Sequence, residues 1–160
     1  MTEKKIVVLA PHPDDETLAC AGTILEKIQE GYDVHVVVMT GGYHSHDLVL
    51  GLKRPSPERI ARTCATELRE ATKILGVNPS NLILLAFEDC KLMQHTTKTK
   101  KRISQILRKI RRCEIYVPYR RDCNEDHRAT YDIFEASVRE ADFPYRIYEY
   151  PVWNKKKSTS

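Results

Sequence analysis

Two clusters of side chains that commonly bind metal ions lie far apart in this chain. The first, His12-Pro13-Asp14-Asp15-Glu16, directly follows an apolar run at residues 6–10. The second is Asp122-Cys123-Asn124-Glu125-Asp126-His127. Two imidazoles and one carboxylate are a common ligand set for a catalytic metal ion that keeps one position open for water. Together the clusters predict a split metal site with hydrolytic chemistry.

The expected metal ligands are His12, Asp15 and His127. His12 and Asp15 lie three residues apart in a loop that enters a helix, so both can turn toward one ion while Pro13 stiffens the turn. Magnesium prefers carboxylates, carbonyls and water, whereas an imidazole-rich set favours zinc, with Fe²⁺ or Co²⁺ as alternatives. We therefore expect one Zn²⁺ ion per chain.

Three further residues are candidates for catalytic roles. Asp14 can take a proton from the attacking water and return it later, although its alternative role is to cap the helix that begins near residue 16. Asn124 can donate a hydrogen bond to the oxygen that becomes negative when an amide carbonyl is attacked. Asp126 either orients Asn124 or a metal-bound imidazole, or caps the helix that follows.

The length and composition indicate one soluble domain. A chain of 160 residues with 41% hydrophobic and 30% charged residues can bury one core. No apolar run approaches the roughly 20 residues that span a bilayer, and the start lacks signal-peptide features, so we expect no integral membrane segment and a cytoplasmic location. The five cysteines form no Cys-x-x-Cys pair, which favours reduced thiols.

Apolar runs typical of strands alternate with segments of helical periodicity. Strands are expected at residues 6–10, 34–39, 82–87, 114–117 and 146–150, and helices at residues 16–30, 57–75, 98–112 and 126–140. This alternation predicts a three-layer α/β, Rossmann-like domain over residues 1–153, with a mainly parallel five-stranded sheet in the order 3-2-1-4-5. Residues 154–160 are expected to form a basic C-terminal tail.

The predicted strand order places both clusters at one edge of the sheet. Strands one and four are neighbours in this order, and each cluster follows the carboxyl end of one of them, where the strand order reverses and ligands commonly bind. Residues 43–57 lack periodicity and are the expected lid or substrate wall, with His44 and His46 as candidate substrate contacts. Arg120, Arg121 and Arg128 could hold an anionic or polyol substrate, although solvation is the default for each.

Basic residues are concentrated at residues 98–112. This segment could face an anion, but Ile103, Ile106, Leu107 and Ile110 recur at helical spacing and favour an amphipathic helix with a solvated basic face. A nucleic-acid or anionic-lipid binding protein is therefore the less favoured function. No nucleic-acid partner is expected, because the sequence lacks a recognised binding module.

The string Ala10-Pro11-His12-Pro13-Asp14-Asp15-Glu16, with Gly22 six residues on, and the later Asp126-His127-Arg128-Ala129 closely resemble the PIG-L/LmbE family of zinc-dependent N-deacetylases. Thr40-Gly41-Gly42, and Glu67 with residues 71–77, resemble intermediate blocks of that family. The resemblance implies a Rossmann-like fold and removal of acetyl from N-acetylglucosamine-type substrates, including glycolipids, inositol or malate glycosides and chitooligosaccharides. It also implies that His12, Asp15 and His127 bind zinc and that Asp14 is the base.

Asn124 departs from the commonest family pattern, which has a histidine at that place. A neutral amide can donate a hydrogen bond but cannot give up a proton, so protonation of the leaving group should fall more heavily on Asp14. We expect a zinc-dependent hydrolase that cleaves the N-acetyl group of an amino sugar or glycoconjugate to acetate and free amine. The alternative is a metal-dependent hydrolase of another amide or ester, and a homo-oligomer is left open.

Overall fold

The computed structural model describes residues 4–44, 55–139 and 141–152. The strands are β1 (Lys5–Ala10), β2 (Asp33–Thr40), β3 (Leu82–Phe87), β4 (Cys113–Pro118) and β5 (Tyr145–Tyr150). The α-helices are α1 (Asp15–Gln29), α2 (Pro57–Ile74), α3 (Thr96–Ile110) and α4 (Glu125–Val138). Two short 3₁₀ helices, η1 (Pro79–Asn81) and η2 (Leu92–His95), precede β3 and α3.

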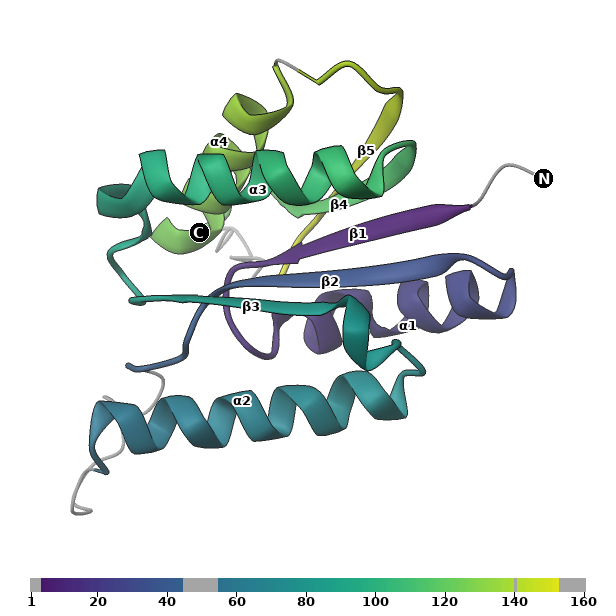
Figure 1. The fold of residues 1–160 in the computed structure, drawn as a ribbon. Coiled ribbons are helices and arrows are strands. Elements are labelled where there is room, and N and C mark those ends of the chain that lie inside the picture. The colour runs from purple at the N-terminus through teal and green to yellow at the C-terminus, as the bar shows by residue number, and fades with distance from the viewer. Residues whose placement is uncertain (1–3, 45–54, 140, 153–160) are drawn as a thin grey trace, which may run out of the picture.

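The strands form one sheet in the order β3-β2-β1-β4-β5, and each neighbouring pair is parallel (Figure 1). This confirms the α/β class and the strand order expected from the sequence. In β1, Val8 is the register partner of Val36 in β2 and of Tyr116 in β4. The central position of β1 brings the loop after β1 beside the loop after β4, at the carboxyl edge of the sheet.

Helices cover both faces of the sheet and make three layers (Figure 1). Because side chains alternate along a strand, Val7 and Leu9 of β1 pack into one core with residues of α3 and α4, whereas Ile6 and Val8 pack into a second core with residues of α1 and α2. All four of these side chains are fully buried. Burial of each stabilises the fold by about 1.5–3 kcal/mol.

Local signals place the ends of helix α2. The Ser56 hydroxyl accepts a hydrogen bond from the backbone N–H of Arg59 at 3.3 Å, and Pro57 occupies the first turn, where its missing N–H costs nothing. Gly76 has a φ of +85°, the left-handed conformation that ends many helices. The expected helix start and stop are both present.

Several expectations concern residues outside those that the structure describes. They are the middle of the expected lid, including His46, the domain end at residue 153 and the basic tail at 154–160. The described part of the chain contains no helix with both the length and the apolar character needed to cross a membrane.

Candidate metal centre

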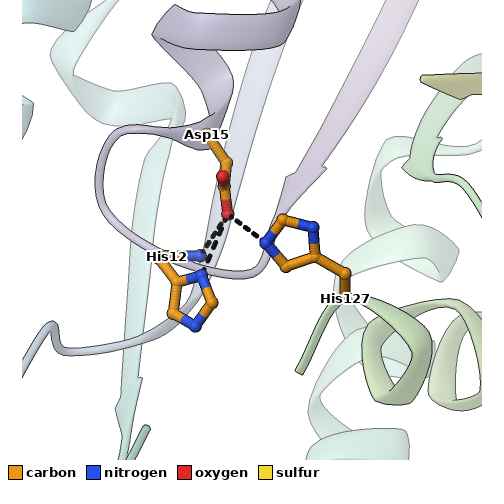
Figure 2. A group of neighbouring side chains, drawn as sticks. All are labelled: His12, Asp15 and His127. Carbon is orange, nitrogen blue, oxygen red and sulfur yellow. Dashed lines mark hydrogen bonds and ion pairs between the residues drawn. The ribbon is translucent and has the colours of Figure 1, made fainter. Parts of the chain in front are cut away.

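The loop after β1 and the start of α4 bring the three expected ligands together. His12 lies in the short loop between β1 and α1, Asp15 is the first residue of α1, and His127 lies in the first turn of α4. Figure 2 shows the three side chains pointing toward one another, with the carboxylate of Asp15 between the two imidazoles. The convergence follows from the adjacency of β1 and β4 in the sheet.

The spacing of the three side chains suits a single ion. One oxygen of Asp15, Oδ2, lies 3.2 Å from Nδ1 of His12 and 3.2 Å from Nε2 of His127. One ligand atom from each residue lies within 4.8 Å of the other two. Two nitrogens and one carboxylate oxygen at such distances can coordinate one divalent cation and leave further coordination positions open.

The burial of His127 supports a metal ion at this place. Its side chain is fully buried, and among the described residues neither ring nitrogen has a hydrogen-bond partner. A buried polar group without a partner costs about 1–3 kcal/mol. A cation bound by Nε2 would remove that cost for the nitrogen that faces Asp15, so the donor set and its burial fit a divalent metal.

Each imidazole also lies close to a second carboxylate, on the side of the ring nitrogen that does not face Asp15. Nε2 of His12 lies 3.0 Å from Oδ2 of Asp126, an oxygen that also accepts the backbone N–H of Cys90 at 2.7 Å. Nδ1 of His127 lies 3.3 Å from Oδ2 of Asp122, at ion-pair distance but without hydrogen-bond alignment. Carboxylates in this position fix the tautomer and the orientation of metal-binding imidazoles.

Asn124, and not Asp126, caps helix α4. The side-chain oxygen of Asn124 accepts the backbone N–H of Asp126 at 2.8 Å. The capping role considered for Asp126 is therefore wrong, because Asp126 is the second residue of the helix, where its carboxylate reaches His12. Since the cap uses only the oxygen of Asn124, its amide NH₂ group is left to donate elsewhere.

The carboxylate of Asp14 is not used to cap helix α1. Asp14 occupies the N-cap position, yet its side chain makes no capping hydrogen bond, so the capping alternative for this side chain is wrong. Its backbone is fixed instead, because its N–H donates to Oε2 of the buried Glu16 at 3.1 Å. Desolvation and the neighbouring carboxylate of Asp15 raise the pKa of Asp14 above its ordinary value.

The electrostatics of the site favour a bound positive charge. Burial lowers the pKa of His12, but hydrogen bonds to Asp126 and Asp15 outweigh it and raise that pKa to about 10. Burial raises the pKa of Asp15, but contacts with His12 and His127 bring it down to about 2. In the metal-free protein at neutral pH, a proton on His12 therefore occupies the place that a cation would take.

Two of the arginines considered as substrate contacts have partners within the protein. Arg120 pairs with Glu149 and lies over the ring of Tyr131, and Arg128 donates to the carbonyl oxygens of Asp122 and Cys123 at 2.8 and 2.9 Å. Arg128 thus holds the backbone of the second cluster, whereas Arg120 ties the loop after β4 to β5. Cys123 is exposed and is not part of the group that could hold a metal.

The sequence motifs predict no individual role for Asp122, beyond its place in the second cluster, and none for Asp89. Asp122 stands five residues before His127, and this acidic residue in a loop that leads to a ligand was the available signal. Asp89 is buried and accepts the backbone N–H groups of Gly42 and His44, each at 2.9 Å, so it ties the loop after β2 to the loop after β3. Nothing in the local sequence pattern predicts that long-range contact.

Comparison with known proteins identifies the family. The family model for GlcNAc-PI de-N-acetylase, PIG-L, matches residues 7–138. This chain belongs to the PIG-L family. The match includes both clusters of the candidate metal centre, which confirms the resemblance carried by their motifs.

Individual relatives agree with the family assignment. This PIG-L chain is 30% identical over 115 residues to the diacetylchitobiose deacetylase of Thermococcus kodakarensis, a match that covers 72% of this chain and 40% of that protein. It superimposes on N,N'-diacetylchitobiose deacetylase from Pyrococcus horikoshii with a TM-score of 0.73 and 28% identity, covering 86% of this chain and 50% of that one. The PIG-L chain therefore spans half or less of the length of these two relatives.

A third similar structure shows the fold alone. GalB, the 4-carboxy-2-hydroxymuconate hydratase of Pseudomonas putida, superimposes with a TM-score of 0.75 at 19% identity, covering 84% of this chain and 55% of that one. A hydratase and deacetylases thus share this architecture. The fold by itself does not fix the reaction, which has to be argued from the residues of the site.

Proposed function

We propose that this PIG-L chain is a metal-dependent N-deacetylase that hydrolyses the N-acetyl group of an N-acetylglucosamine-type amino sugar or glycoconjugate to acetate and a free amine. The observation that carries the proposal is the group formed by His12, Asp15 and His127. Beside it lies the carboxylate of Asp14, which neither caps a helix nor forms an ion pair with the described residues. The names of the similar deacetylases support the substrate class.

In this proposal, His12, Asp15 and His127 hold one Zn²⁺ ion. Two nitrogens and one oxygen favour Zn²⁺ over Mg²⁺, and Fe²⁺ or Co²⁺ would accept the same set. When bound, the ion supplies Lewis acidity, which polarises the amide carbonyl and makes water acidic enough to attack near neutral pH.

Asp14 acts as the base and then as the acid. Its carboxylate takes a proton from the attacking water as the new carbon–oxygen bond forms, and gives that proton to the amide nitrogen as the carbon–nitrogen bond breaks. The raised pKa of Asp14 suits the second step, because a weaker acid holds its proton until the nitrogen is ready to leave. Acetate and the amine are the products.

Asn124 and Asp126 support this chemistry from the start of α4. The amide NH₂ of Asn124 donates to the carbonyl oxygen as it becomes negative, while its own oxygen stays in the helix cap and fixes the direction of the amide. Asp126 holds His12 through Nε2 and leaves Nδ1 directed toward Asp15. Asp126 is thus a positioning residue.

The test is metal analysis combined with acetate release. Purified protein is assayed for bound metal and then incubated with N-acetylglucosamine, N,N'-diacetylchitobiose, N-acetylglucosaminyl glycolipids, simple N-alkyl acetamides and acetate esters. We expect turnover of the amino sugars and little turnover of the small amides and esters. Preferred cleavage of the small amides or esters would indicate the alternative metal-dependent hydrolase.

The cytoplasmic location and a homo-oligomer both stay predictions.

A further inference from the structure

Within the part of the chain that the structure describes, no strand pairs with the outer edge of β3, and this strand is apolar. β3 is the last strand of the sheet on its side, and its sequence is Leu-Ile-Leu-Leu-Ala-Phe. None of its six residues is buried, and none is charged. Natural edge strands are usually protected by charges, prolines, β-bulges or covering elements, because their open backbone groups pair readily with another strand. In β3 the pairing with β2 is irregular near Phe87, but Leu82, Ile83 and Leu84 pair in regular register. The other edge strand, β5, carries Arg146 and Glu149.

The α3 side of this edge is a cationic groove. Five exposed cations, Lys98, Lys101, Arg102, Arg108 and Lys109, follow one another at helical spacing along α3. They line two adjoining cavities of about 700 and 430 Å³ that share Arg102 and Gln105, and whose floor includes Ile83, Leu85 and Phe87 of β3. Within the described residues none of the five forms an ion pair, and no acidic residue lines either cavity.

The α2 side of the same edge is predominantly apolar. A cavity of about 480 Å³ between α2 and β3 is lined by Leu68, Val77, Leu82 and Leu84, with Arg69 and Lys73 among its other lining residues. Figure 1 shows α2 and α3 on opposite sides of the sheet that β3 ends. The two faces of the β3 edge thus differ in character, cationic toward α3 and mainly apolar toward α2.

From these observations we propose that the β3 edge binds an extended acidic segment of a partner protein. The segment would lie between the cationic groove on the α3 side and the apolar cavity on the α2 side. Side chains of an added strand point alternately to the two faces of the sheet. Acidic residues at every second position would meet the cations of α3, and apolar residues between them would pack against Leu82 and Leu84. A second copy of this chain fits poorly, because two α3 walls of the same charge would repel each other.

The experiment measures binding of a labelled peptide with alternating glutamate and valine to the full chain by fluorescence polarisation. A peptide of the same composition with all glutamates before all valines is the sequence control. We expect saturable binding of the alternating peptide that weakens when salt rises from ~50 to ~500 mM. The block peptide should bind several-fold more weakly, because its glutamates cannot all face α3.

A pair of matched variants locates the binding surface. The double variant Lys101→Glu/Arg102→Glu should weaken peptide binding by about tenfold or more, since it reverses two contacts in the cationic wall. Arg59→Glu/Arg62→Glu makes the same change of charge on the exposed surface of α2 and should bind like the wild type. Thermal melting of both variants reports whether they fold.

Three results would overturn the proposal. The first is equal binding of the alternating and block peptides, which would show charge attraction without strand pairing. The second is the same loss in both double variants while each remains folded. The third is displacement of the labelled peptide by phosphatidylserine vesicles or single-stranded DNA at a lower concentration of negative charge than unlabelled peptide requires. That result would assign the groove to a membrane or a nucleic acid. Acetate release measures the deacetylase activity separately, so none of these three results bears on the proposed function.

Discussion

Oδ2 of Asp122 lies 3.3 Å from Nδ1 of His127, and both side chains are completely buried. The other nitrogen of the same imidazole faces Asp15, 3.2 Å away. His127 is therefore held between a carboxylate that shares the candidate metal centre and a carboxylate behind it. At this ion-pair distance the charge of Asp122 can orient the imidazole of His127 so that Nε2 faces Asp15.

Asp122→Asn should weaken metal binding. The amide keeps the size of the side chain but loses the charge that orients the imidazole, and removal of such a partner typically costs 10–100-fold in metal affinity. The measurement is a competition titration of metal-free protein with Zn²⁺ and a chromophoric chelator. Asp132→Asn, an exposed aspartate on the same helix, is the matched control and should bind like the wild type. Equal affinities of the two variants would show that Asp122 has no orienting role.

Asp14→Asn should abolish most of the activity and leave the metal in place. An amide cannot carry the proton from water to the leaving nitrogen, and loss of a general acid or base costs about 10²–10⁴-fold in rate. Initial rates of acetate release at saturating substrate, together with metal content per chain, check both halves of the prediction. A variant that keeps wild-type turnover would remove Asp14 from the mechanism.

Asn124→Ser separates the two functions of Asn124. Serine is a good N-cap residue, so α4 should keep its start and the free energy of unfolding should change by less than about 1 kcal/mol. The shorter side chain cannot reach the carbonyl oxygen as the amide does, and loss of one such donor costs about 10²–10³ in kcat. Chemical denaturation and steady-state kinetics measure the two effects. A stable variant with full kcat would limit Asn124 to the helix cap.

Metal binding should release a proton and become tighter as the pH rises. The pKa of His12 in the metal-free protein is raised to about 10, so at neutral pH the ring is protonated and must lose that proton to bind an ion. The pKa of Asp15 is about 2, and Asp15 therefore contributes no proton. Calorimetric titration with Zn²⁺ in buffers of different ionisation enthalpy should give about one proton per ion. No dependence on the buffer would contradict the protonated His12.

Much of the fold follows from local pattern. Strands and helices alternate visibly in the sequence, and that alternation with short connections leaves few topologies, so the position of β1 beside β4 could be predicted. This adjacency, and not any local signal, brings His12 to His127. The basic segment was likewise correctly expected to form a helix that buries Ile103, Ile106 and Leu107.

The contacts that could not be predicted depend on side-chain direction or on distant loops. Asn124 and Asp126 are both good N-cap residues two positions apart, and only the register of α4 decides between them. The hydrogen bond from Cys90 to Asp126 joins the loop after β3 to the first turn of α4, 36 residues further along the chain. A periodicity pattern shows that the basic face of α3 is not in the core, but it cannot show that the face lies beside an open strand edge.

The most direct test of the metal centre is anomalous diffraction at the zinc absorption edge from crystals of the protein grown with Zn²⁺. We expect one peak per chain, within coordination distance of His12, Asp15 and His127, and its loss in His127→Ala crystals. A peak held by other residues, or no peak near these three in the wild type, would contradict it.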